Sequence, residues 1–225
     1  MLGSHKEWSL ARPGAGKLCW RKPLEALGIM IGRLCAHWVY GGFLAGLMLF
    51  ALTPLFAAGW SADFTLVFIQ LPLYMLHQYE EHDADRFRIY VNRTVGDGAE
   101  ALTPAAVFVI NIVGVWAVVV ATLYLARYVD IGLGLIAVYL SIVNALAHIA
   151  GALVTRRYNP GLVTAAVLFL PVGGYTLWAF HKTGAASTAD HLIAIGASVI
   201  IHALIITYVN VRRRTLLAKP GLSAA

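Results

Sequence analysis

Six residues at the end of a hydrophobic segment, His77-Gln78-Tyr79-Glu80-Glu81-His82, carry the side chains best suited to chemistry. The residues before them are mostly apolar, and charge at a membrane boundary is costly unless it is paired, protonated or bound to a metal. On a helix, His77 and Glu81 are four residues apart and Glu80 is three from His77, so all three can point to one side. This spacing suits metal ligands, and it equally suits a general acid and base.

Polar side chains recur in the later hydrophobic segments at similar helical spacings. Asn144 and His148 are four residues apart, Asn111 is the strongly polar residue inside its segment, and His202 lies in the last segment. At about 1.5 Å per helical residue, Asn111, His148 and His202 lie roughly 10–15 Å inside the basic or proline residues that flank their segments, and His77 lies about 14 Å from Arg86. We therefore expect four helices to bring polar groups into one layer, in one half of the membrane.

The expected donor set contains nitrogen and oxygen without thiolate, which suits iron, manganese or zinc. Two metals bridged by adjacent glutamates would favour oxidation of a lipid-like substrate by dioxygen. One zinc would favour hydrolysis, with a glutamate activating water. Glu80, Glu81 and Asn144 are the expected catalytic residues. The expected metal ligands are His77, Glu80, Glu81, His148 and His202.

Three other functions are compatible with the same residues. Without a metal, a His/Glu pair can perform acid–base catalysis, as in an isomerase or cyclase. Proton-coupled carriers and metal transporters also contain intramembrane His and Glu. In a scaffold, the polar groups would only hold helices together. We favour an enzyme, because the polar layer is confined to one half of the membrane and no inverted repeat relates 34–126 to 131–211.

The composition is that of an integral membrane protein. Of 225 residues, 60% are hydrophobic and 12% are charged, with a mean hydropathy of +0.73, whereas soluble domains carry about 25% charged residues. The sequence predicts an all-α polytopic membrane helical bundle with six transmembrane helices. The expected spans are 34–57, 61–79, 104–126, 131–154, 161–180 and 191–211.

The distribution of basic residues predicts the orientation and the domain organisation. With both termini in the cytoplasm, only Arg127 and Lys182 of the 17 basic residues fall outside. We expect a basic cytoplasmic tail over 1–23, without a cleavable signal peptide, a transmembrane domain over 24–214 and a C-terminal tail over 215–225. This topology accounts for the positive charge without nucleic-acid binding. Cys19 and Cys35 lie near the cytoplasmic side, so no disulfide is expected.

Two connections have features of interest. In Arg156-Arg157-Tyr158-Asn159-Pro160-Gly161, Asn159 is the expected N-cap and Pro160 the first helical residue. Arg156, Arg157 and the free N–H groups of the helix N-terminus at Asn159 are expected to hold the acidic headgroup of a hydrophobic or lipid-like ligand. The connection from 82 to 103 is long enough to be a lid or simply a solvated loop.

The chain resembles the HXXEE family of bacterial membrane proteins over about 77–175. The resemblance implies a multi-pass protein of the bacterial cytoplasmic (inner) membrane, marks these motifs as site residues and supplies no reaction. Its motifs are His77-x-x-Glu80-Glu81, Asn144-x-x-x-His148 and Arg157-Tyr158-Asn159-Pro160-Gly161-Leu162-Val163-Thr164.

A weaker resemblance is to intramembrane glutamate peptidases of the prenyl-protein endopeptidase type. These enzymes carry a Glu-Glu-x-x-x-Arg run followed by His and Asn. Here the run from Glu80-Glu81 to Arg86 is one residue too long, which would turn the arginine to another helix face.

Overall fold

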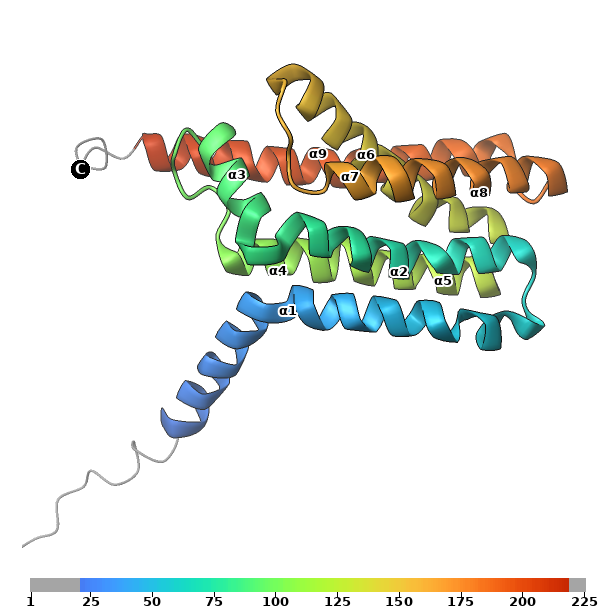
Figure 1. The fold of residues 1–225 in the computed structure, drawn as a ribbon, viewed down its shortest axis with the longest axis horizontal. Coiled ribbons are helices and arrows are strands. Elements are labelled where there is room, and N and C mark those ends of the chain that lie inside the picture. The colour runs from blue at the N-terminus through green and yellow to red at the C-terminus, as the bar shows by residue number, and fades with distance from the viewer. Residues whose placement is uncertain (1–20, 219–225) are drawn as a thin grey trace, which may run out of the picture.

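The computed structural model describes residues 21–218, and within that range the chain forms helices and no strands (Figure 1). The all-α prediction is therefore confirmed for this part of the chain. Residues 1–20, with Cys19 and most of the expected basic tail, and residues 219–225 lie outside the described range. The α-helices are α1 (Arg21–Phe56), α2 (Ala62–His82), α3 (Arg86–Thr94), α4 (Pro104–Asn111), α5 (Val118–Tyr128), α6 (Leu135–Thr155), α7 (Leu162–Thr164), α8 (Leu170–Thr183) and α9 (Thr188–Leu217).

Short 3-10 and π-helical segments join several of these helices into longer rods. A π-helical segment, Ile112–Ala117, connects α4 to α5, and another, Ala165–Phe169, connects α7 to α8. Turns of 3-10 helix precede α6 at Ile131–Gly134 and follow α1 at Ala57–Gly59. The bundle therefore consists of six long rods, with α3 as an additional short helix.

Five of the rods are long and apolar enough to cross a membrane, which supports a multi-pass membrane protein. They overlap five of the six predicted spans, and their bounds are Glu25–Gly59, Pro104–Tyr128, Ile131–Thr155, Leu162–Thr183 and Thr188–Leu217. The predicted second span corresponds to α2, which is not among the five because its polar residues lower its hydropathy.

The polar helix α2 lies at the centre of the bundle. It packs against α1, α5, α6, α7 and α8, and its buried residues include Gln70, His77, Gln78 and Glu81. Polar side chains are tolerated at membrane depth where neighbouring helices cover them. The rod that is not apolar enough to count among the five candidate spans is therefore the one that lies among the other rods.

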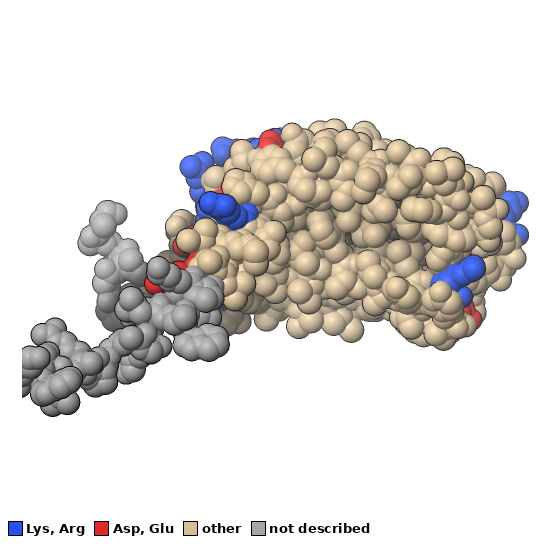
Figure 2. Space-filling model, turned by 90° about the horizontal axis from the view of Figure 1, so that it is seen from below, with Lys and Arg blue, Asp and Glu red and all other residues tan. Residues whose placement is uncertain are grey.

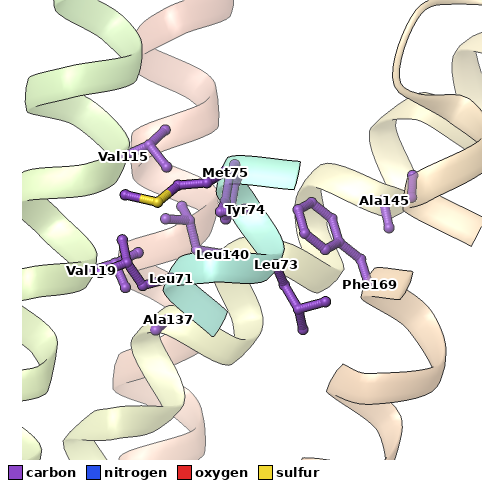
Figure 3. Packing of buried hydrophobic residues seen from close by; sticks show 11 residues of the cluster. Leu71, Leu73, Tyr74, Met75, Val115, Val119, Ala137, Leu140, Ala145 and Phe169 are labelled. Atoms are coloured by element: carbon purple, nitrogen blue, oxygen red, sulfur yellow. The ribbon is translucent and has the colours of Figure 1, made fainter. Parts of the chain in front are cut away.

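An apolar core lies beside the polar part of α2 (Figure 3). Tyr74 and Phe169, both almost fully buried, pack with ring centroids 4.8 Å apart, and Leu140 belongs to the same cluster. Phe169 ends the π-helical segment before α8 and also lies 4.4 Å, centroid to centroid, from the His77 ring. Packing of these aromatic groups fixes the His77 ring from one side.

Charged residues gather at the two ends of the molecule, and an apolar belt separates them (Figure 2). The described ends of α1 and α9 lie at the same end of the bundle as α3 (Figure 1). The long connection from 82 to 103 contains α3, and Arg213 of α9 holds it by contacts with Asp97 and the carbonyl of Val95. The expected solvated loop or lid is thus a helix fastened to α9.

Candidate metal centre

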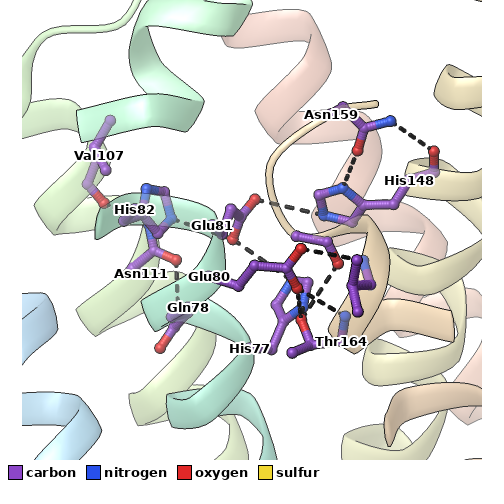
Figure 4. Close-up of polar contacts among 12 residues, drawn as sticks. His77, Gln78, Glu80, Glu81, His82, Val107, Asn111, His148, Asn159 and Thr164 are labelled. Atoms are coloured by element: carbon purple, nitrogen blue, oxygen red, sulfur yellow. Dashed lines mark hydrogen bonds and ion pairs between the residues drawn. The ribbon is translucent and has the colours of Figure 1, made fainter. Parts of the chain in front are cut away.

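Three buried side chains, His77, Glu81 and His148, bring potential ligand atoms within 4.8 Å of one another. His77 and Glu81 lie one turn apart on α2, whereas His148 comes from α6 (Figure 4). The Nε2 atom of His77 lies 3.6 Å from Glu81 Oε2, and the Nε2 atom of His148 lies 3.5 Å from Glu81 Oε1. Two imidazoles therefore face the two oxygens of one carboxylate.

The hydrogen bonds around His77 fix which ring nitrogen carries the proton. Its Nδ1 lies 2.8 Å from the Thr164 hydroxyl, which donates its single hydrogen to Glu80 Oε2. A carboxylate only accepts, so the hydroxyl must accept from His77 Nδ1–H. Nε2, which has no hydrogen-bond partner among the described residues, then carries the lone pair. His77 is thus held in the tautomer that a metal ligand requires.

A parallel arrangement holds His148. Asn159 Nδ2 donates to the carbonyl of His148 at 2.9 Å, so its Oδ1 must be the atom that faces His148 Nδ1 at 2.6 Å. Because an amide oxygen only accepts, Nδ1 carries the proton and Nε2 is left to face Glu81. Asn159 therefore positions His148 from behind, as partners of metal-ligating histidines do.

The expectation that Asn159 caps the following helix is wrong. The residue before α7 is Gly161, which offers no side-chain cap, while the Asn159 side chain is engaged with His148. Gly161 has a φ of +97°, and a Cβ there would lie 2.7 Å from His148 Cε1 and 2.9 Å from His77 Cε1. Only glycine fits this position, because the backbone is left-handed and two imidazoles touch it.

Glu80 takes the capping role instead, from a different helix. Its carboxylate accepts from the Val163 and Thr164 amides at 3.1 and 2.7 Å and from the Tyr158 hydroxyl at 2.8 Å. A carboxylate is stabilising at a helix N-terminus, where N–H groups lack intrahelical partners. Glu80 therefore ties α2 to α7, and the amides expected to hold a ligand headgroup already bind a carboxylate of this chain.

The donor set fits one divalent metal ion. Atoms bound at about 2.0–2.2 Å in a tetrahedral site lie roughly 3.3–3.6 Å apart. The two histidines approach separate oxygens of Glu81 at 3.6 and 3.5 Å, and one ligand atom from each of the three residues lies within 4.8 Å of the others. His77 supplies a buried nitrogen without a hydrogen-bond partner among the described residues, and buried orphan polar atoms of this kind require an explanation such as an ion. Two histidines and one carboxylate suit iron, manganese or zinc.

A cavity of about 410 Å³ opens beside this cluster and is lined by α2, α3, α4, α6 and α9. Its walls are mostly aliphatic and aromatic, with residues such as Tyr90, Val107 and Ile206. The polar groups that line it are Glu81, His82, Asn111, Asn144, His148, Asn159 and His202, together with hydroxyls of Tyr74, Tyr90, Thr94 and Thr155. An apolar chamber with a few convergent polar groups is the usual form of a small-molecule site.

Three expected or supporting site residues line the cavity outside the ligand cluster. His82 Nε2 lies 3.2 Å from Glu81 Oε2, and its ring packs against Trp38 and Phe87. His202 donates from Nδ1 to the Ser198 carbonyl at 2.8 Å, and Asn144 has a buried oxygen without a hydrogen-bond partner among the described residues. These groups are placed to contact a molecule in the cavity.

Asn111, which lines the cavity, is also part of a buried hydrogen-bond chain. Gln78 Nε2 donates to Asn111 Oδ1 at 2.8 Å, and Trp116 donates from Nε1 to Gln78 Oε1 at 2.5 Å. Asn111 in turn donates to the Val107 carbonyl. This chain fastens α2 to the rod 104–128, with Trp116 lying in its π-helical segment.

Arg157 stands apart from the cluster. It is exposed, and its side chain makes no hydrogen bond or ion pair with the residues that the structure describes. The neighbouring Tyr158 reaches Glu80, and partial burial and this hydrogen bond raise the pKa of Tyr158 above its ordinary value. At this turn, Tyr158 rather than Arg157 is joined to the site.

Sequence reasoning assigned no role to Thr164, Tyr158 or Gly161, which complete the cluster. All three stand in the motif from Arg157 to Thr164, so the motif was the available signal. Their roles depend on contacts about 80 residues away in sequence, with Glu80 and His77.

Residues 68–176 match the sequence model of a family described as "Protein of unknown function with HXXEE motif". The predicted resemblance is confirmed over this part of the chain, which contains all the residues of the cluster. No curated protein and no solved structure matches the chain at a significant level.

Proposed function

We propose that this HXXEE protein is a membrane-embedded enzyme that uses one divalent metal ion to oxidise a hydrophobic, lipid-like molecule. The observation that carries the proposal is the convergence of His77 Nε2, Glu81 and His148 Nε2 within 4.8 Å inside an apolar bundle. Two histidines and one carboxylate form the ligand set of non-haem iron oxygenases. A bound iron or manganese would supply redox chemistry with dioxygen.

The other glutamate of the motif, Glu80, bears on how many metal ions the site would hold. A two-metal site would need Glu80 as a further ligand, but both Glu80 oxygens accept hydrogen bonds from the start of the rod 162–183. Freeing them would leave the Val163 and Thr164 amides unsatisfied. The arrangement therefore supports a single ion.

The cavity supports the substrate class. Its walls are mostly apolar, so a hydrocarbon chain would be desolvated along them. His82, Asn144 and His202 can donate to or accept from a polar group near the reacting carbon. The same apolar walls would exclude bulk water from the site.

Zinc-dependent hydrolysis is a second candidate, because two histidines and a glutamate are also the ligand set of catalytic zinc sites. In that case zinc would supply Lewis-acid chemistry, and His82 would be the nearest side chain able to move a proton. Identification of the metal separates the two candidates without knowledge of the substrate.

The test is elemental analysis of the purified protein, with His77→Ala, Glu81→Gln and His148→Ala beside the wild type. We expect about one iron or manganese ion per chain in the wild type and its loss in each variant. His181→Ala is the matched control, because His181 is exposed on α8 and belongs to no described cluster. One zinc ion with the same losses would favour hydrolysis.

A folded wild-type protein that binds no metal after iron, manganese and zinc are each added back would contradict the proposal. Metal retained in all three variants would contradict the assigned ligands. Circular dichroism of each variant distinguishes loss of a ligand from loss of the fold.

A further inference from the structure

An apolar groove of about 540 Å³ runs along the outside of the bundle between α1 and the rod 104–128. On α1 it follows Arg33, His37, Gly41 and Ala45, which recur every four residues and therefore lie on one face. Gly41 has no atom within 4 Å of where a Cβ would be, so its absent side chain leaves the groove open. The groove is separate from the cavity beside Glu81.

Two tryptophans line the groove, and one of them contacts a residue that lines the cavity. A Cβ at Gly42 would lie 2.7 Å from the Trp116 ring, so the indole rests directly on the backbone of α1. Trp38 packs edge-on against Trp116, with ring centroids 5.7 Å apart. It also packs against the His82 ring, with centroids 5.2 Å apart. Trp38 therefore lies between the groove and His82, which lines the cavity.

The length of the groove matches one leaflet of a bilayer. From Arg33 to Ala45 is 12 residues, or about 18 Å along a helix, and half of a hydrocarbon core is about 15 Å. Arg33 lines the groove at its end nearest the start of α1, just before the predicted first span. A hydrocarbon chain lying in this groove would thus place its headgroup beside Arg33.

Arg33 is exposed and makes no ion pair with the residues that the structure describes. Its guanidinium group is therefore available to pair with an anionic ligand. Lipids of the cytoplasmic leaflet are the anionic ones that attract basic residues at a membrane boundary, and the predicted orientation places Arg33 in that leaflet. Arginine suits a phosphate because its planar group donates two parallel hydrogen bonds.

We infer that this groove binds an anionic phospholipid of the cytoplasmic leaflet, with its phosphate at Arg33 and one acyl chain along Gly41 and Ala45. The bound chain would press on Trp38 and Trp116 and so support the His82 ring that packs against Trp38. The inference depends on membrane insertion and not on the metal or the reaction.

Native mass spectrometry of detergent-purified protein mixed with equal amounts of phosphatidylglycerol and phosphatidylcholine tests this. We expect wild-type protein to retain one phosphatidylglycerol per chain preferentially. Arg33→Gln should lower that preference about fivefold, the effect of one basic residue near an anionic surface. Gly41→Leu, which fills the open part of the groove, should reduce retention of both lipids.

Two variants serve as matched controls and should behave as wild type. Arg214→Gln removes an exposed arginine at the same end of the molecule, and Gly174→Leu fills an open position on α8. Equal phosphatidylglycerol preference in wild type and Arg33→Gln would overturn the inference. So would a wild-type dimer that Gly41→Leu dissociates without loss of lipid, because a second copy of the chain would then occupy the groove. If Gly41→Leu fails to fold, the Arg33→Gln comparison still decides.

Discussion

Adjacent glutamates in the motif have different partners. Glu81 lies between the Nε2 atoms of His77 and His148, whereas Glu80 accepts two backbone amides and two hydroxyls at the turn before α8. Consecutive residues on a helix point about 100° apart, so the two carboxylates face different neighbours. One is available to a metal, and the other fixes the turn that holds the histidines.

Gly161 provides the sharpest test at the scale of one residue. Gly161→Ala would introduce a Cβ at a φ of +97° and within 3 Å of both imidazoles. We expect destabilisation of more than about 2 kcal/mol, because the strain of a left-handed residue alone costs about 1–2 kcal/mol. Metal affinity should fall at least about tenfold, as for other changes behind a ligand. Melting temperature and metal titration measure the two effects.

The matched control is Gly184→Ala. Gly184 also has a positive φ, of +67°, but nothing lies within 4 Å of its Cβ position. It should show the backbone cost alone and bind metal as wild type does. Equal metal affinity in the two variants would show that Gly161 does not shape the site.

At the scale of elements, the site depends on α2 being anchored to the start of the rod 162–183. That rod begins with a single turn, α7, and continues through the π-helical segment Ala165–Phe169 into α8. π-helical segments are often found at functional sites. Two residues contact the His77 ring here: Thr164, directly before the segment, and Phe169, its last residue.

Glu80→Gln should separate anchoring from metal binding. The partners of Glu80 all donate hydrogen bonds to its carboxylate, whereas the NH₂ group of a glutamine would itself donate and could not accept from them. Hydrogen bonds to charged groups contribute about 1.5–3 kcal/mol. We expect a loss of stability of that size, measured as a lower melting temperature in detergent. Metal stoichiometry at saturation should stay near one per chain.

Glu81→Gln is the paired comparison and should lose the metal while α7 stays anchored. If Glu80→Gln instead abolished metal binding without lowering the melting temperature, Glu80 would be a ligand, as the sequence suggested. Hydrogen exchange of the Val163 and Thr164 amides would report the anchoring directly, because Glu80 protects both.

For the whole molecule, the positions of the helix ends and turns predict how the chain crosses the membrane. The turns α1–α2 and α8–α9 lie at one end of the bundle, and α3 and the end of α9 lie at the other (Figure 1). If α2 crosses the membrane with the five apolar rods, both termini are in the cytoplasm, as the basic residues predict. The central position of α2 makes this the arrangement that keeps its polar groups covered.

Single cysteines introduced after Cys19 and Cys35 are replaced by alanine test the topology. In intact cells, a membrane-impermeant maleimide should label Gly59→Cys and Ala189→Cys but not Arg214→Cys. After permeabilisation all three should react. Labelling of Arg214→Cys in intact cells would contradict the six-span prediction with cytoplasmic termini, and the cysteine-free protein controls for background.

The sequence by itself determined the helical class, the membrane character and the residues of the motifs. Apolar segments near 20 residues long specify membrane helices locally, and His77 and Glu81 share a helix face through their spacing alone. These features depend only on residues close together in the chain. The family match covers residues 68–176, the range that contains these motifs.

Only the tertiary structure decided what each polar residue contacts. Asn159 follows the pattern of a helix cap, yet its side chain binds His148, because the turn after α6 folds back over that helix. Glu80 has the spacing of a ligand, yet it lies against the amides of Val163 and Thr164, 83 and 84 residues later. Side-chain chemistry and helical spacing leave such choices open, and they are settled by which helices pack together and where each turn ends.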